Sequence, residues 1–280
     1  MRPRDPHRFV NDLDSQTIGR LVDRLENRGR DAVFTRLFDQ YAATLEVPPG
    51  GRVLELGCGT GVVTRALARR ADFRGTVLGI DQSAEFIEVA KAQAESAGCA
   101  ETASFRVGDA HGLEIEPGSF DVVIAHTLIS HVTSPETVLR EAARALRSGG
   151  RLVVFDGDYA SLTYDYPDEV LARRMNEALA NATFNNPMIM RALPRLFGSL
   201  GFRLTRSYAD VVAEVGEASY FRSFAQTYVP FVKRSGLVDP QSVDTWFDAQ
   251  LSAMDDGSFF ASCNYYTYVA QRVVALSSVA

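Results

Sequence analysis

The sequence predicts an α/β fold built on a seven-stranded, mostly parallel sheet with an antiparallel last strand, helices on both faces and a helical cap. Between residues 52 and 158, short apolar segments alternate with helical patterns, as expected for parallel strands joined by right-handed crossovers. A glycine-rich turn follows the first apolar segment. Near the C-terminus, the segment FFASCNYYTYVAQR combines aromatic and β-branched residues, which is typical of a strand.

Length and composition exclude several classes of protein. A chain of 280 residues is long enough for one large α/β domain with a cap, or for two small domains. Its net charge of −6 argues against extended nucleic-acid binding, which needs a basic surface. No stretch approaches the roughly 18 apolar residues of a membrane span, and the start MRPRDPHRF lacks the apolar core of a signal peptide. We therefore expect a cytoplasmic protein that binds neither nucleic acid nor membrane.

The N-terminal region predicts two helices after a polar, exposed lead-in at residues 1–14. Apolar residues recur at helical spacing over 15–27 and again over 31–45. The apolar face of the second helix packs on the core in the simpler interpretation. In the sharper interpretation, its aromatic residues Phe38 and Tyr41 cover a bound cofactor. We expect residues 1–48 to form a helical lid, 49–160 a cofactor-binding core, and 161–280 cap helices with the last strands of the sheet.

The stretch RVLELGCGTG, residues 52–61, predicts a buried strand that runs into a tight turn and then a helix. Gly57, Gly59 and Gly61 carry no β-carbon, so the backbone can bend sharply and a ligand can approach the free N–H groups of the helix. A dinucleotide-binding motif would place its third glycine at position 62, which is Val62. The spacing therefore favours a different cofactor.

Two acidic residues follow the next strands. Asp81 ends the predicted strand at 76–80, where a carboxylate can accept hydrogen bonds from both hydroxyls of a ribose. It could instead cap the helix predicted at 83–97, although Ser83 can do so itself. Asp109 and Ala110 follow the strand at 103–107. The neighbouring His111 is expected to be solvated.

These motifs together resemble the class I S-adenosylmethionine-dependent methyltransferases, over about residues 52–158. The resemblance rests on the pattern E-x-G-x-G-x-G from Glu55 to Gly61, the acids after the second and third strands, and the ending ALRSGG before the fifth strand at 151–155. It implies a Rossmann-like fold, S-adenosylmethionine as cofactor and S-adenosylhomocysteine as product. The implied cofactor-binding residues are Glu55, Gly57, Gly59, Gly61, Asp81, Gln82, Asp109 at the adenine amino group, Ala110 through its N–H, His126 through its carbonyl, and Tyr41.

Methyl transfer from a sulfonium is a direct displacement, so few side chains are compulsory. His131, which follows the strand at 120–125, is the candidate general base, because imidazole titrates near neutral pH. The alternative is a packed histidine or one that begins a helix. A magnesium-dependent reaction would want an acid directly after this strand, and the residues there supply none. Since the three cysteines are also unclustered, we expect no metal and no disulfide framework.

The acceptor must be inferred from the cap, for which the sequence predicts helices at 169–183, 187–200, 216–235 and 241–254 and a strand at 202–208. Twenty of the 28 aromatic residues lie after position 150, which favours an apolar or aromatic small molecule. Nucleic-acid amino-methyltransferases usually carry an Asn/Asp-Pro-Pro-Tyr/Phe element after the fourth strand, and AHTL stands here. Candidate acceptor contacts are Asp156, Asp158, Tyr159, Asn185, Asn186 and Met188.

We therefore expect a methyltransferase that acts on a small metabolite, of the quinone-biosynthesis or natural-product type, with oxygen as the acceptor atom. Carbon and nitrogen acceptors remain open. A homologue that binds the same cofactor but catalyses a cyclisation or rearrangement, and an inactive partner subunit, are the alternatives. A monomer or a homodimer is expected.

Overall fold

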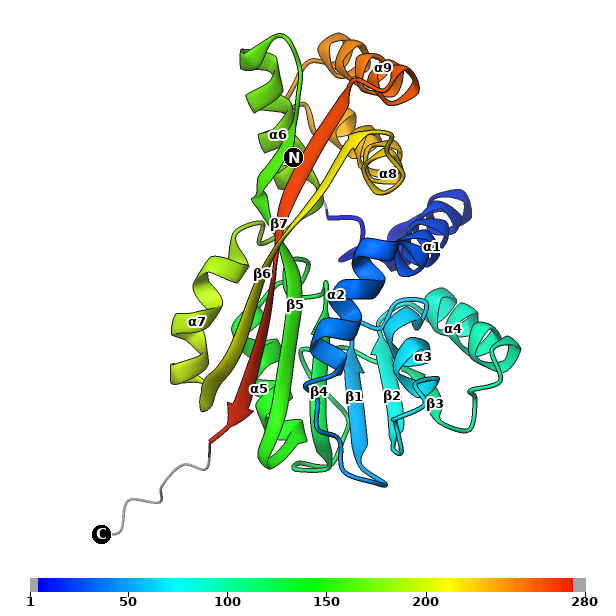
Figure 1. Ribbon diagram of the computed structural model, residues 1–280, viewed down its shortest axis with the longest axis vertical. Coiled ribbons are helices and arrows are strands. Elements are labelled where there is room, and N and C mark those ends of the chain that lie inside the picture. Colours follow the sequence, from blue (N-terminus) through cyan, green and yellow to red (C-terminus); the bar gives the residue numbers. More distant parts are fainter. Residues whose placement is uncertain (1–4, 274–280) are drawn as a thin grey trace.

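The computed structural model describes residues 5–273 of the chain. Seven strands form one sheet in the order β3-β2-β1-β4-β5-β7-β6, with helices on both faces (Figure 1). The strands are β1 (Arg52–Leu56), β2 (Thr76–Asp81), β3 (Ala103–Val107), β4 (Phe120–His126), β5 (Leu146–Tyr164), β6 (Phe202–Gly216) and β7 (Phe259–Arg272). The helices are η1 (Val10–Asp12), α1 (Ser15–Arg30), α2 (Ala32–Ala42), α3 (Val62–Ala68), α4 (Ala84–Ser96), α5 (Pro135–Ala145), α6 (Glu169–Thr183), α7 (Ile189–Ser199), α8 (Tyr220–Ser235) and α9 (Pro240–Asp256).

The five strands that precede the cap are parallel, as predicted. β1 pairs with β2 and β4, and β4 pairs with β5, all in parallel register. Alternate residues of these strands enter two separate cores, because successive side chains of a strand point to opposite faces. Val53 belongs to the core on the side of α2, whereas Leu54 belongs to the core on the side of α5 and α7.

The last part of the sheet confirms the antiparallel strand and corrects its boundaries. β7 lies antiparallel between β5 and β6. β5 and β6 are both longer than predicted, since β7 supplies hydrogen-bonding partners as far as Tyr164 on one side and Gly216 on the other. The helix predicted from 216 consequently begins at Tyr220. The closing strands do not form a hairpin, because α8 and α9 lie between them in the chain.

Beyond the strand ends, α6, α8 and α9 form the cap, which Figure 1 shows at the end of the molecule opposite the carboxyl end of β7. The cap packs on the long extensions of β5 and β7, and Trp246 of α9 is fully buried against Tyr164. The aromatic surplus of the C-terminal half is therefore largely core.

The N-terminal helices form as predicted. Asp14 caps α1 by accepting a hydrogen bond from the Thr17 N–H, and Asp31 caps α2 in the same way. The expected exposed lead-in is only partly observed: Asp5 and Val10 are almost completely buried, whereas Arg8, Asn11 and Asp12 are exposed. Residues 1–4 of that prediction lie outside the described residues.

Candidate active site

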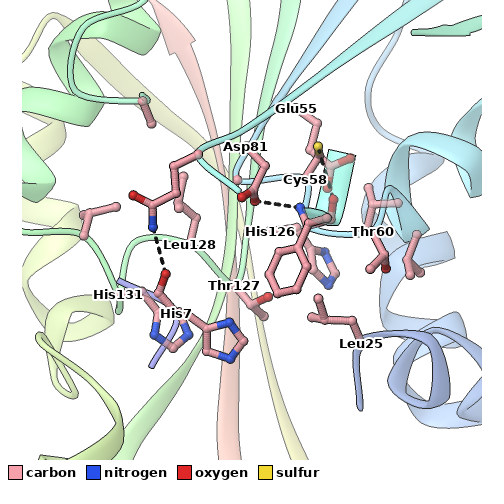
Figure 2. A pocket seen from close by; sticks show the side chains of 18 of the residues that line it. His7, Leu25, Glu55, Cys58, Thr60, Asp81, His126, Thr127, Leu128 and His131 are labelled. Carbon is pink, nitrogen blue, oxygen red and sulfur yellow. Dashed lines mark hydrogen bonds between the residues drawn. The ribbon is translucent and has the colours of Figure 1, made fainter. Parts of the chain in front are cut away.

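A cavity of about 330 Å³ opens at the carboxyl ends of β1, β2 and β4. Its walls come from the glycine turn, from the loops after β2, β3 and β4, from the inner face of α1, and from Tyr159, Phe184 and Tyr228 of the C-terminal half. This edge of a parallel sheet is the usual ligand site of such folds, and the volume lies in the range of small-molecule sites. Figure 2 shows that side chains far apart in the sequence converge there.

The glycine turn forms a cradle that other residues would obstruct. Gly57, Gly59 and Gly61 have φ angles of +64°, +53° and +78°, which L-residues with a side chain rarely adopt. A β-carbon on Gly57 would lie 2.5 Å from the Leu128 side chain, and one on Gly61 would lie 2.5 Å from Phe105. Gly57 and Gly59 line the cavity, whereas Gly61 does not, and α3 begins directly after the turn.

Asp81 faces the cavity from the end of β2. Its carboxylate accepts hydrogen bonds from the Gly59 N–H at 2.8 Å and from the Ser83 N–H at 2.9 Å. Burial raises the pKa of Asp81, and these backbone donors partly oppose the rise. Ser83 caps α4, so the capping alternative for Asp81 is not realised. Each carboxylate oxygen retains a lone pair for a ligand.

Glu55 is buried at the cavity floor on β1. The Thr64 hydroxyl of α3 donates a hydrogen bond to its carboxylate. Burial raises the pKa of Glu55 to about 7, against the lowering effect of this bond. A carboxyl that titrates near neutrality inside a cavity marks a candidate functional group.

Asp109 and Ala110 line the cavity beyond β3. Asp109 is engaged with His111, whose N–H and Nδ1 lie 2.8 and 2.7 Å from its Oδ1. These hydrogen bonds lower the pKa of Asp109, although partial burial opposes them. His111 is partly exposed, as predicted, with 26% of its side chain accessible. Its Nε2 also lies 2.8 Å from the Thr133 hydroxyl, so His111 joins the loop after β3 to the loop after β4.

Gln82 lines the cavity and also binds the backbone of the N-terminal segment. Its side-chain amide donates hydrogen bonds to the backbone carbonyls of His7 and Arg8, at 2.8 and 3.2 Å. The end of β2 thereby holds the N-terminal segment over the cavity.

His126 lies at the cavity wall, and Tyr41 lies behind it. The Tyr41 hydroxyl is 2.9 Å from the His126 Nδ1. Burial lowers the pKa of His126, so its ring is neutral near pH 7. Tyr41 is fully buried and is not among the lining residues, whereas Phe38 is. The prediction that Tyr41 itself covers the cofactor therefore needs correction: α2 presents Phe38, because Tyr41 points into the core.

Thr127 follows β4 with a φ of +51°, a strained conformation for a β-branched residue. Its hydroxyl accepts a hydrogen bond from Arg28 at 2.9 Å. Arg28 itself lines the cavity from α1. This hydrogen bond joins the end of β4 to α1.

His131 lines the cavity together with a histidine that the sequence did not reveal. The Nδ1 of His131 lies 2.8 Å from the Asp5 carboxylate, which fixes the proton on Nδ1 and leaves Nε2 as an acceptor. His7 lies beside it, with the two ring centroids 4.6 Å apart (Figure 2). The His7 Nε2 lies 2.8 Å from the Tyr228 hydroxyl. Burial and the neighbouring cations lower the pKa of His7.

The predicted acceptor contacts divide into two groups. Tyr159 lines the cavity and stacks on Phe184 at 3.4 Å. Asp156 and Asp158 are not among the lining residues: Asp156 accepts from the Ser130 N–H, and Asp158 pairs with Arg191. Because they are two positions apart on β5, these two side chains point to the same face of the sheet, away from the cavity.

Asn185 and Asn186 do not line the cavity either. Asn185 donates to the His131 carbonyl at 2.7 Å, and Asn186 donates to the Val132 carbonyl at 2.6 Å. They hold the loop that carries His131. Met188 lies exposed outside the cavity.

Among residues 5–273, no group of three or more histidine, cysteine or acidic side chains is arranged to hold a metal ion. Within the same residues, no helix has the length and apolar character needed to cross a membrane.

A mostly parallel seven-stranded sheet that carries this glycine turn, with Asp81 and Asp109 at the same cavity, defines the class I S-adenosylmethionine-dependent methyltransferases. The model of a methyltransferase domain family matches residues 48–208. The chain belongs to this family, and the predicted resemblance and cofactor are confirmed. The cradle, whose glycines leave no room for side chains, and the free lone pairs of Asp81 fit that cofactor.

Among its relatives, the chain is 34% identical to an uncharacterized 37.1 kDa protein of a Streptomyces fradiae transposon, over 81% of this chain and 64% of that protein. It is 36% identical to a 27-O-demethylrifamycin SV methyltransferase of Amycolatopsis mediterranei, over 51% of each chain. The chain thus spans about half to two thirds of these relatives. A putative methyltransferase of Bacillus halodurans has the same fold, with a TM-score of 0.61 and 16% identity over 85% of this chain and 99% of that one.

Proposed function

We propose that the protein transfers a methyl group from S-adenosylmethionine to a small apolar or aromatic metabolite, with oxygen as the acceptor atom. The observation that carries this proposal is the continuity of the cavity. Its walls include both the glycine turn with Asp81 and the aromatic residues of the C-terminal half with His131. One space can therefore hold a cofactor and an acceptor in contact.

The chain's residues would hold the cofactor by complementary hydrogen bonds. The N–H groups after Gly59 and Gly61 would face the amino-acid portion, with Glu55 beneath them and the His126 carbonyl beside it, whereas the N–H after Gly57 donates to the Ile80 carbonyl. Asp81 accepts from the ribose hydroxyls, while Gln82 steadies the loop. Asp109 and the Ala110 N–H meet the adenine edge. When bound, the sulfonium supplies an activated methyl group with a neutral leaving group.

His131 acts as the general base in this proposal. Its Nε2 would take the proton of the acceptor hydroxyl, which leaves the oxygen as the nucleophile for the methyl group that the bound cofactor supplies. Asp5 holds the imidazole by its Nδ1 and stabilises the imidazolium that forms. Asp5 is thus a positioning residue.

The cap side and the N-terminal helices exclude water from the reaction. Tyr159, Phe184 and Phe38 present apolar surface to the cavity, and a dry site strengthens the electrostatic interactions within it.

We also propose that residues 1–48 act as a lid over the core at 49–160. The protein is cytoplasmic in this proposal and works as a monomer or homodimer, and its acceptor is a small molecule rather than a nucleic acid.

Incubation with methyl-labelled S-adenosylmethionine and a panel of phenols, hydroxy acids and amines tests the proposal. A product heavier by one methylene unit, with label in an O-methyl group, is expected. An unchanged mass with a rearranged skeleton would support the cyclisation alternative. Absence of cofactor binding by calorimetry would support an inactive partner subunit.

A further inference from the structure

We propose that the acceptor carries an anionic group, a carboxylate or a phosphate, which binds the guanidinium of Arg24. This inference rests on the function proposed above. Arg24 lies on α1, lines the cavity and is 5% exposed. It forms no ion pair with any residue of the described range 5–273. A buried cation without an acid is costly, unless a ligand supplies the counter-charge.

The hydrogen-bonding capacity of Arg24 is largely unused. Its Nη1 has no hydrogen-bond partner within residues 5–273. Its Nη2 lies 3.4 Å from the Tyr220 hydroxyl, which is a long contact. A guanidinium carries five N–H donors in a fixed fork that matches a carboxylate or phosphate. An anion at this end of the cavity would supply the acceptor that these buried donors lack.

An aromatic cage holds the guanidinium in place. Its carbon lies 5.1, 4.9 and 4.9 Å from the ring centroids of Tyr220, Phe224 and Tyr228 of α8. Cation–π attraction offsets part of the desolvation and fixes the orientation of the fork. The ring faces satisfy no N–H donor, and the contact with the Tyr220 hydroxyl is long, so the cage positions Arg24 for a ligand without replacing one.

Three acids could be considered as partners of Arg24, and none pairs with it. Asp23 directly precedes it but is exposed, and residues one apart on a helix do not face each other. Glu26 of α1 pairs with Arg65 and accepts from Thr60. Asp5 pairs with His131. Neither of these two carboxylates is therefore free to neutralise Arg24.

The position of Arg24 assigns it to the acceptor rather than to the cofactor. Residues four apart are neighbours on one helix face, and Arg28, one turn after Arg24, contacts Thr127 at the end of β4. That is the side on which the carboxylate of the cofactor's amino-acid portion is expected. The ring contacts of Arg24 are with α8, and Arg24 lines the cavity together with His7 and Tyr228. An acceptor with its anion at Arg24 and its hydroxyl at His131 would span this aromatic end.

Isothermal calorimetry in the presence of S-adenosylhomocysteine tests the inference with matched probes. We expect 4-hydroxybenzoate or phenyl phosphate to bind at least tenfold more tightly than the neutral 4-hydroxybenzamide. The comparison of the two acids distinguishes a carboxylate site from a phosphate site. Arg24→Gln should abolish the preference and leave the dissociation constant of S-adenosylhomocysteine within twofold. Arg24→Met provides a second variant, because its apolar chain packs against the same three rings.

Arg20→Gln is the matched control, since Arg20 lies one turn earlier on α1 and is exposed. It should retain the preference for acids. Equal binding of acid and amide by the native protein, no binding of either acid, or an unchanged preference in both Arg24 variants would overturn the inference. Methyl transfer to neutral acceptors alone would also overturn it while leaving the proposed function intact. Acid-selective binding without transfer to any acceptor would overturn the proposed function instead.

Discussion

The Nδ1 of His131 lies 2.8 Å from the carboxylate of Asp5, although 126 positions separate them in the chain. This pair joins the N-terminal segment to the loop after β4. Backbone N–H groups of His7 and Asn185 also donate to Asp5, at 2.9 and 3.2 Å. The carboxylate is therefore fixed independently of the histidine that it orients.

Replacing the histidine tests its role as the base. His131→Ala should lower kcat by about 100-fold or more, the scale of a lost general base, with an unchanged affinity for S-adenosylhomocysteine. Steady-state kinetics and calorimetry measure the two quantities. His111→Ala provides a contrast, because that imidazole holds Asp109: it should weaken cofactor binding and leave the proton transfer intact. Full activity of His131→Ala at neutral pH would exclude it as the base.

Asp5→Asn should lower kcat about tenfold, within the range of general acid–base contributions, while KM and cofactor affinity change little. The amide still fills the space but no longer stabilises an imidazolium. Asp5→Glu should restore part of kcat. A loss in KM alone, or in stability alone, would mean that Asp5 only holds the N-terminal segment in place.

Asp81→Ala should weaken S-adenosylmethionine binding by about 1.5–3 kcal/mol, the usual value for charge-assisted hydrogen bonds. Part of this loss arises because the Gly59 N–H also loses its acceptor. Calorimetry measures the change, and Asp72→Ala, an exposed aspartate at the surface, provides the control. An unchanged dissociation constant would remove Asp81 from the cofactor site.

Gly57→Ala should both destabilise the fold and impair cofactor binding. The left-handed backbone costs about 1–2 kcal/mol for a residue with a side chain, and the clash with Leu128 adds about 1–3 kcal/mol. Gly98→Ala isolates the first effect, because Gly98 has a φ of +66° but nothing within 4 Å of an added β-carbon. Urea unfolding should show a clearly larger loss for Gly57→Ala, and equal losses would contradict the crowded cradle.

The raised pKa of Glu55 predicts that the free energy of unfolding depends on pH. Burial raises its folded pKa to about 7 from an ordinary value of 4.5. The native state thus binds the proton more tightly than the unfolded state, so the contribution of Glu55 to stability falls as pH rises between these values. The native protein should lose about 2–3 kcal/mol relative to Glu55→Gln between pH 5 and pH 8. Urea unfolding at both pH values measures the difference, and a constant difference would contradict the raised pKa.

The sequence predicted the features that depend on local pattern. Short apolar segments between helical patterns predicted the parallel strands, and the glycine turn, together with the family resemblance, predicted the cradle and its cofactor. Residues whose role depends on distant partners were missed. Asp5 and His7 carry no local signal, because their burial arises from contacts with His131 and Tyr228. Arg24 likewise belongs to an ordinary amphipathic helix until α8 is placed beside it.

Strand lengths and side-chain directions were the other limits of the prediction. The extensions of β5 and β6 exist because β7 pairs with both, and no pattern within either segment indicates that partner. Asp156 follows an apolar strand as the other site acids do, yet it lies on the opposite face and binds the Ser130 N–H.

A crystal structure of the protein with S-adenosylhomocysteine tests the central claim most directly. We predict the amino-acid portion at the glycine turn, the ribose hydroxyls on Asp81 and the sulfur facing His131 across the cavity. A ligand bound elsewhere, or a nicotinamide dinucleotide bound in its place, would contradict the account.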